Sequence, residues 1–402
     1  MSHDELVQRV HGALKLDPSE YSVHPEAEKQ TRQRADRALR NVLGYLVYRD
    51  QERGWRITAP NLEQVGLLHF NYLDLDAVAA RDERWREAHP ALRDAAPATR
   101  ESVARTLLDW FRRELAIQVD YLSSSYQETI TQQSSQHLTG MWALDPEERL
   151  EQYRLVVLGP RPRKGQLPPE LRFLSRRSGF AQYLRRESAF QHVEGRLSTD
   201  DAGAVIEDLI EVLAAAGLLV SETADGKGTV GYAIPAGALI WRAGDGSRGF
   251  HDPIRRPSIP EGGTSTNQYF VDLYSGEADR LAGLAAREHT AQVPNEARKR
   301  REEEFKEARL PILYASPTLE LGVDIKELNV VNMRNVPPTP ANYAQRSGRA
   351  GRNGQPALVF TYCSTFQSHD QYFFARPQQM VAGAVSPPRV DLLNEELLKA
   401  HI

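Results

Sequence analysis

The stretch QRSGRAGRNGQ, residues 345–355, is the part of this sequence that decides the fold. It places Arg346, Arg349 and Arg352 three residues apart, with the last two on either side of Gly351. On a helix this spacing puts side chains on one face, so the guanidinium groups can converge on a single anion such as a phosphate. The stretch therefore predicts a phosphate-binding element, and it leaves open which phosphate is bound and which other part of the protein presents it.

The composition is that of an ordinary globular protein with room for two or three domains in 402 residues. The net charge of -4 gives no overall nucleic-acid signature, so contacts with a polyanion must come from local basic patches. Cys363 is the single cysteine, which excludes a disulfide framework and an all-cysteine zinc site within one chain, and we predict no metal-binding residue. No apolar run approaches the length of a membrane span and the start lacks an apolar signal core, so we expect a cytoplasmic protein without a membrane partner.

The first part of the chain is expected to be mainly helical. Apolar residues recur at helical spacing in residues 4–16, 26–48 and 98–122, with charged residues between them. We expect Trp55, Trp110 and Phe111 to pack in the core of this region.

A basic segment, residues 161–186, comes next. Such a cluster is usually a solvated face, but the aromatic residues Phe173, Phe180 and Tyr183 between the basic ones leave a nucleic-acid contact open. The basic residues of the segment are Arg161, Arg163, Lys164, Arg172, Arg176, Arg177, Arg185 and Arg186.

A helix and a β-hairpin are predicted after the basic segment. Ser198 or Thr199 can cap a helix that ends at Gly217, and two strands within residues 218–235 flank the turn ADGKG. This order of elements is typical of a winged-helix module. Such modules bind DNA in some proteins and are packing pieces inside larger enzymes, and the sequence leaves both roles open.

Strands alternate with helices in the last part of the chain, which predicts a parallel sheet with ligand-binding loops at the carboxyl ends of its strands. The predicted elements are strands within residues 286–293, 311–317, 328–336 and 356–363 and a charged helix over residues 295–308.

The stretch SPTLELGVDI, residues 316–325, directly follows one of these strands. Ser316 and Thr318 offer hydroxyl groups and backbone amides at the carboxyl end of the strand. Gly322 lets the backbone approach a ligand closely, and Asp324 can accept hydrogen bonds from a ribose hydroxyl or from an arginine. Because QRSGRAGR follows across one further strand, the two stretches together predict a shared ligand site.

The two stretches resemble motifs V and VI of the superfamily 2 helicases of the DExH/DEAD type. The resemblance implies an α/β fold: a partial second RecA-like lobe, similar to P-loop NTPases, with a large mainly helical insertion and a winged-helix-like module. The implied domains are residues 1–160 (mainly helical insertion), 161–245 (basic segment and winged-helix-like module), 246–385 (second RecA-like lobe) and 386–402 (start of a truncated C-terminal region).

In that family ATP binds between two lobes, and motif VI of the second lobe reaches the γ-phosphate. By position, the resemblance implies that Arg349 and Arg352 are catalytic arginines facing the triphosphate, with Arg352 as the arginine finger. It implies that Arg346 binds the nucleotide, and that Gln345 contacts the nucleotide or the acidic motif of the other lobe.

The resemblance to motif V assigns roles to the other stretch. Gly322 and Asp324 would lie on the nucleotide side and couple it to strand movement, whereas Ser316 and Thr318 would contact the nucleic acid.

A narrower resemblance covers nearly the whole chain. Residues 53–68, 286–293 and 334–363 resemble the large bacterial helicases that include the helicase subunit of DISARM phage defence, DrmA. This resemblance implies that His289 and Gln292 lie close to the bound strand or to its supporting loop. A buried structural role remains the alternative for His289.

Neither a GxxxxGK[ST] loop nor an acidic Walker B box after an apolar strand occurs in the sequence. ATP and Mg²⁺ are therefore expected to bind only when a first RecA-like lobe joins in cis or in trans, and the chain alone is not expected to hydrolyse ATP. The resemblance also implies that the chain begins just after motif IV and ends before the C-terminal region, which would leave apolar sheet surface exposed.

Two functions from different classes follow. The first is the C-terminal lobe of an ATP-dependent helicase or translocase in phage defence, with nucleic acid (DNA in preference to RNA), a first lobe and other defence subunits as partners. The second is a non-catalytic DNA-binding or scaffold protein that uses the winged helix and the basic segment.

Overall fold

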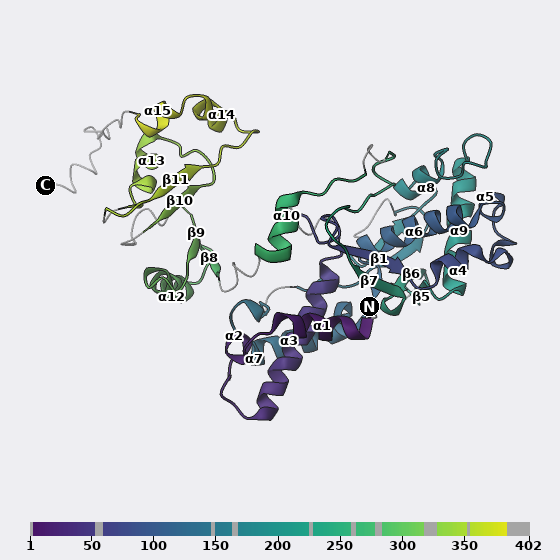
Figure 1. Cartoon of the computed structure of the whole chain (residues 1–402), viewed down its shortest axis with the longest axis horizontal. Coiled ribbons are helices and arrows are strands. Elements are labelled where there is room, and N and C mark those ends of the chain that lie inside the picture. Colours follow the sequence, from purple (N-terminus) through teal and green to yellow (C-terminus); the bar gives the residue numbers. More distant parts are fainter. Residues whose placement is uncertain are drawn as a thin grey trace. The chain divides into compact units, whose positions relative to one another are not determined.

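The computed structural model describes residues 3–52, 59–145, 149–162, 168–224, 228–258, 263–277, 284–316, 328–351 and 354–383. The chain divides into two compact units, an N-terminal unit of Met1–Arg280 and a C-terminal unit of Leu281–Ile402 (Figure 1). Both units combine helices with strands. Within the described ranges, no helix has the length and apolar character that crossing a membrane requires.

Helices dominate the first half of the N-terminal unit. Two of the predicted helices are confirmed, as α1 and α3. The helices of this unit are α1 (His3–Leu14), α2 (Pro18–Tyr21), α3 (Lys29–Arg49), α4 (Leu75–Ala80), α5 (Pro90–Arg93), α6 (Pro97–Arg113), α7 (Ser124–His137), α8 (Gly179–Leu184), α9 (Thr199–Ala215) and α10 (Gln268–Asp272).

The third predicted helix, over residues 98–122, is too long. Helix α6 ends at Arg113, because Leu115 adopts a left-handed backbone with φ of 61° that no helix continues. The chain then enters the short strand β2 (Ile117–Gln118). Leu115 and Ile117 are both fully buried. Buried positions are apolar in a helix and in a strand alike, so these residues continued the apolar pattern of the helix.

A five-stranded mixed sheet and a two-stranded antiparallel sheet complete this unit. The larger sheet has the strand order β2-β6-β3-β4, with β5 paired to β6, and the smaller sheet pairs β1 with β7. The strands not yet given are β1 (Leu68–Tyr72), β3 (Leu155–Leu158), β4 (Leu171–Leu174), β5 (Val220–Thr223), β6 (Val230–Pro235) and β7 (Leu239–Ala243).

The predicted helix and hairpin after the basic segment are confirmed. Ser198 caps α9 in a capping box with Asp201, and Gly217 follows the helix with φ of 76°. Strands β5 and β6 pair antiparallel as the hairpin. Strand β6 also pairs with β2 and β3, so the hairpin is built into the five-stranded sheet.

One apolar core holds the N-terminal unit together. Trp85, Phe111, Tyr48 and Phe180 are fully buried in it, and Trp110 packs against it while half-buried. Phe111 therefore packs as predicted, and Trp55 lies outside the described residues. Each such side chain contributes about 1.5–3 kcal/mol by leaving water.

The C-terminal unit consists of two β-α-β units followed by two short helices (Figure 1). Strands β8 and β9 pair in parallel around helix α12, and β10 and β11 pair in parallel around α13, so each pair has the helical crossover that parallel strands need. All four predicted strands and the predicted charged helix are confirmed. The elements are β8 (Ala286–His289), α12 (Asn295–Lys306), β9 (Ile312–Ala315), β10 (Val330–Met333), α13 (Pro340–Ser347), β11 (Leu358–Thr361), α14 (Ser368–Ala375) and α15 (Pro377–Val381).

Apolar sheet surface is exposed in the described part of this unit. Val330 and Leu358 are paired in register on one face of the β10–β11 sheet and are 52% and 57% exposed, and Phe360 on the same face is 44% exposed. Burial on the other face is greater, with Met333 only 4% exposed.

Candidate nucleotide-phosphate site

The arginine-rich stretch is a helix end and a turn rather than one continuous helix. Helix α13 is capped by Thr339, whose hydroxyl accepts a hydrogen bond from the Asn342 amide at 3.2 Å, and it ends at Ser347. Gln345 and Arg346 therefore lie in its last turn, and Arg349 lies in the turn that follows. The prediction that helical spacing alone aligns the arginines is wrong for Arg349.

Two positions in the turn after the helix require glycine. A Cβ atom on Gly348 would lie 2.8 Å from the Ala344 carbonyl oxygen, which is closer than real Cβ contacts. Gly351 has φ of 70°, a conformation that side-chain-bearing residues rarely adopt. Its amide donates to the Leu328 carbonyl at 3.1 Å, which ties the turn to the segment before β10.

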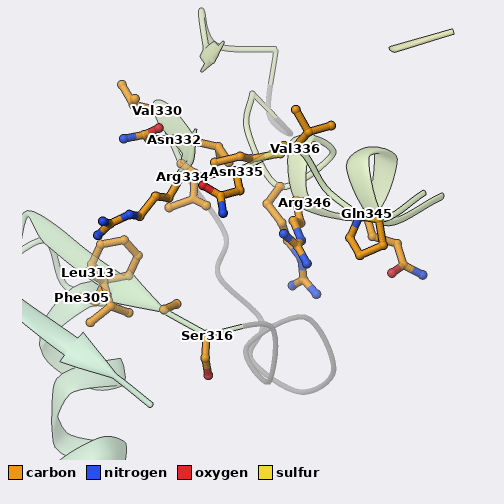
Figure 2. Close-up of a pocket in the computed structure, with 16 residues that line it drawn as sticks. Phe305, Leu313, Ser316, Val330, Asn332, Arg334, Asn335, Val336, Gln345 and Arg346 are labelled. Atoms are coloured by element: carbon orange, nitrogen blue, oxygen red, sulfur yellow. The ribbon is translucent and has the colours of Figure 1, made fainter. Parts of the chain in front are cut away.

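Gln345, Arg346 and Arg349 line one cavity of about 500 Å³ (Figure 2). Ser316, at the carboxyl end of β9, and Arg334, just beyond β10, line it as well. Figure 2 shows Arg346 extending from α13 toward the wall that carries Ser316, while Arg334 extends toward Phe305 and Leu313.

The charge of this cavity favours an anion. Arg334, Arg346 and Arg349 line it, and the described lining residues include no carboxylate. Guanidinium groups carry a permanent charge and donate in a planar fork that matches phosphate oxygens. The arrangement can therefore bind a phosphate-bearing ligand.

Arg334 was not singled out in the sequence. It is exposed and has no hydrogen-bond or ion-pair partner among the residues that the structure describes. The signal that could have found it is its place directly after a strand, at the edge where parallel sheets bind ligands.

His289 lies at the end of β8 and is buried, with 4% of its surface exposed. Its Nε2 atom lies 2.6 Å from Glu302 Oε1 on α12, and its carbonyl accepts a hydrogen bond from the Ser316 amide at 3.2 Å. These contacts favour the structural alternative for His289. Gln292 is exposed, and neither residue is among the described lining residues of the cavity.

Four of the predicted site residues fall in the gaps of the described ranges. They are Thr318, Gly322, Asp324 and Arg352.

Two basic residues of the basic segment, Arg163 and Lys164, lie outside the described residues, and four of the others make internal contacts: Arg172, Arg176, Arg185 and Arg186. Arg172 Nε lies 3.0 Å from Glu114 Oε2, and Arg186 donates to the Ile254 carbonyl at 2.8 Å. Phe180 and Tyr183 are buried in the core and cannot stack on bases there. For these residues the structure favours packing over a nucleic-acid contact.

No group of three or more histidine, cysteine, aspartate or glutamate side chains that could hold a metal ion is found in the described part of the chain.

Comparison with known proteins matches part of the chain to helicases. The helicase conserved C-terminal domain matches residues 265–354. The chain is 36% identical over 137 residues to the Druantia protein DruE of Escherichia coli, which covers 31% of this chain and 8% of that protein. It is 36% identical over 93 residues to the DEAD-box ATP-dependent RNA helicase 30 of Arabidopsis thaliana, which covers 22% of this chain and 15% of that protein.

A solved structure of the Mycobacterium smegmatis helicase Lhr bound to ssDNA and AMP-PNP is also similar. It is 28% identical, with a TM-score of 0.27, and the match covers 33% of this chain and 17% of that one. The chain thus spans only a small part of the length of the relatives it matches. Residues 265–354 match the helicase conserved C-terminal domain, and the similar proteins support a C-terminal lobe of the superfamily 2 helicase type in this part of the chain.

Proposed function

We propose that the chain supplies the C-terminal lobe of an ATP-dependent DNA helicase or translocase. The observation that carries the proposal is the cavity in which Gln345, Arg346 and Arg349 come together without a carboxylate among its described lining residues. The three side chains suit the negative charge of a triphosphate.

In this proposal ATP binds between this lobe and a first RecA-like lobe, which joins in cis or in trans. Arg349 and Arg352 face the triphosphate, and Arg352 is the arginine finger that neutralises charge on the transferred phosphoryl group. Gln345 and Arg346 help to orient the nucleotide. The first lobe supplies the P-loop lysine and the carboxylate that holds Mg²⁺, because no P-loop sequence occurs in this chain.

In this proposal the motif V stretch, residues 316–325, couples ATP binding to movement along DNA. Ser316 and Thr318 contact the nucleic-acid backbone, and Gly322 and Asp324 pass the closure of the two lobes to that contact. His289 supports the loop that carries Ser316, because its carbonyl accepts the Ser316 amide hydrogen bond.

The proposed setting is phage defence in the cytoplasm, together with other defence subunits. It rests on the resemblance to the helicase subunit of DISARM. Gln292 is proposed to lie near the bound strand, for which its exposed position in the turn after β8 is suitable.

The experiment is an ATPase measurement with single-stranded DNA, duplex DNA and single-stranded RNA. It compares the chain alone with a longer form that includes a first RecA-like lobe. We expect hydrolysis only in the longer form, with stimulation by DNA. Arg352→Ala should lower kcat by about a thousandfold or more while DNA binding is kept, because the finger acts on the transition state.

Arg309→Ala is the matched control, since Arg309 is exposed and, among the described residues, pairs only with the nearby Glu307. This variant should hydrolyse ATP at the unchanged rate. The proposal fails if the longer form is inactive while the chain alone binds DNA in a salt-dependent way. That result would instead support the non-catalytic DNA-binding or scaffold protein.

A further inference from the structure

Asp370 is a buried carboxylate that the proposed function does not use. It lies in the first turn of α14 and is 0% exposed. In the described part of the chain it has no ion-pair partner, and its contacts are hydrogen bonds. A carboxylate is costly to bury unless hydrogen bonds replace its water. The groups that Asp370 binds are therefore held firmly to it.

Both carboxylate oxygens accept backbone hydrogen bonds from the same edge of the β10–β11 sheet. The Val336 amide donates to Oδ1 at 3.3 Å, and the Ser364 amide donates to Oδ2 at 2.8 Å. These are the third residues beyond the last paired residues of the strands, Met333 and Thr361. Asp370 thus ties together the two segments that leave the sheet.

Neighbouring contacts hold the same place. His369 Nε2 lies 3.1 Å from the Pro337 carbonyl oxygen, which can only accept, so the ring nitrogen donates. At Gly383, after α15, a Cβ atom would lie 2.6 Å from Cγ of Pro340, the first residue of α13. The segment from α14 to Gly383 therefore packs against the chain where α13 begins.

The segment that Asp370 and His369 contact leads directly to the arginines. Val336 is part of the cavity wall, and α13 begins four residues later and carries Arg346, with Arg349 in the turn beyond. We infer that Asp370 is a positioning residue: by holding the Val336 amide it fixes where α13 begins, and so where Arg346 and Arg349 are presented. The inference rests on the proposed function, in which these arginines face a triphosphate.

Hydrogen exchange of the full chain tests the positioning directly. Asp370→Asn keeps the size of the side chain but replaces one acceptor oxygen with a donor. We expect the amides of residues 341–351 to exchange about tenfold faster or more, and those of β8 and β9 to be unchanged. Unchanged exchange in residues 341–351 overturns the inference, and so does equal acceleration throughout the C-terminal unit, which indicates a merely structural role.

Glu307→Gln is the matched control for this experiment. Glu307 is exposed, lies in the same unit and pairs with Arg309 alone within the ranges that the structure describes. We expect this variant to exchange like the unmodified chain at every position.

A double-mutant cycle in the two-lobed helicase tests the consequence for hydrolysis. Asp370→Asn should lower kcat for ATP by about ten- to a hundredfold, as small displacements of catalytic groups do. In a background of Arg349→Ala and Arg352→Ala the same change should cost less than about twofold, because its effect passes through the arginines. An equal loss in both backgrounds overturns the inference.

The two measurements separate failure of the inference from failure of the proposed function. If Arg349→Ala and Arg352→Ala leave hydrolysis unchanged, the proposed function fails, and hydrogen exchange alone decides whether Asp370 fixes α13. If Asp370→Asn does not fold, His369→Ala takes its place. We then expect about threefold faster exchange in the same residues and about threefold lower kcat. No response of residues 341–351 to His369→Ala then overturns the inference.

Discussion

At the scale of single residues, a buried charged network stands out in the N-terminal unit. Arg112 is 0% exposed, and it donates to Glu63 Oε1 at 2.5 Å and to Gln51 Oε1 at 3.1 Å. Its guanidinium carbon lies 4.0 Å from the centre of the Phe70 ring. Tyr72 belongs to the same network, because its hydroxyl donates to Asp109 at 2.7 Å and Asp109 lies 3.3 Å from Arg112. Such a network specifies one arrangement of β1 against α6.

Tyr72 gives this network a testable pH dependence. Burial, and then the charge of Asp109, raise the pKa of Tyr72 well above its usual value. Above about pH 10 the unfolded chain ionises this tyrosine while the folded chain keeps it neutral, so stability falls as the pH rises. Tyr72→Phe should remove the release of one proton on unfolding above that pH. The free energy of unfolding in urea should therefore fall less steeply with pH.

Tyr269→Phe serves as the control for that slope, because Tyr269 is 67% exposed. It should leave the slope between pH 9 and pH 11 as in the unmodified chain. A Tyr72→Phe slope equal to that of the control would contradict the explanation.

At the scale of elements, the sequence predicted what local signals determine. Ser198 and Gly217 bound α9, and alternation of strands and helices gave both parallel pairs, because caps, turns and periodicity are local properties. The end of α6 could not be found, since Leu115 and Ile117 are apolar in either conformation. Asp370 was missed because the amides it binds come from Val336 and Ser364, which only the folded chain brings to it.

The cap of α9 offers a prediction at this scale. Ser198 accepts a hydrogen bond from the Asp201 amide at 3.0 Å, and the reciprocal bonds from Ser198 hold the pKa of Asp201 below its usual value. Ser198→Ala should lower the free energy of unfolding of the N-terminal unit by about 1 kcal/mol in urea denaturation. Ser135→Ala, at an exposed position within α7, should change it by less than half as much.

At the scale of the whole molecule, the two units differ in the core that stabilises them. The large cluster of buried apolar residues runs from Leu6 to Trp241 and lies wholly in the N-terminal unit. In the described part of the C-terminal unit the buried apolar residues are Val293, Leu310, Met333, Val336 and Met380. Less apolar burial gives less stability, so the C-terminal unit should unfold first.

The sequence supplies a separate probe for each unit. All five tryptophans lie at or before position 241, whereas Cys363 is the single cysteine. Burial, and then the charge of Asp370, raise the pKa of the Cys363 thiol, which slows its labelling in the folded chain. Labelling of Cys363 should accelerate at a lower urea concentration than the change in tryptophan fluorescence. Coincident transitions would contradict this order.

The pairing of β1 with β7 has a consequence for synthesis on the ribosome. Leu68 and Ala243 face each other in this sheet, so β1 leaves the ribosome about 170 residues before its partner strand exists. At roughly 5–20 residues per second this is a delay of about 10–30 s, during which Phe70 has no Trp241 ring to pack against. The nascent chain therefore carries β1 without its partner strand for most of the time in which the N-terminal unit is made.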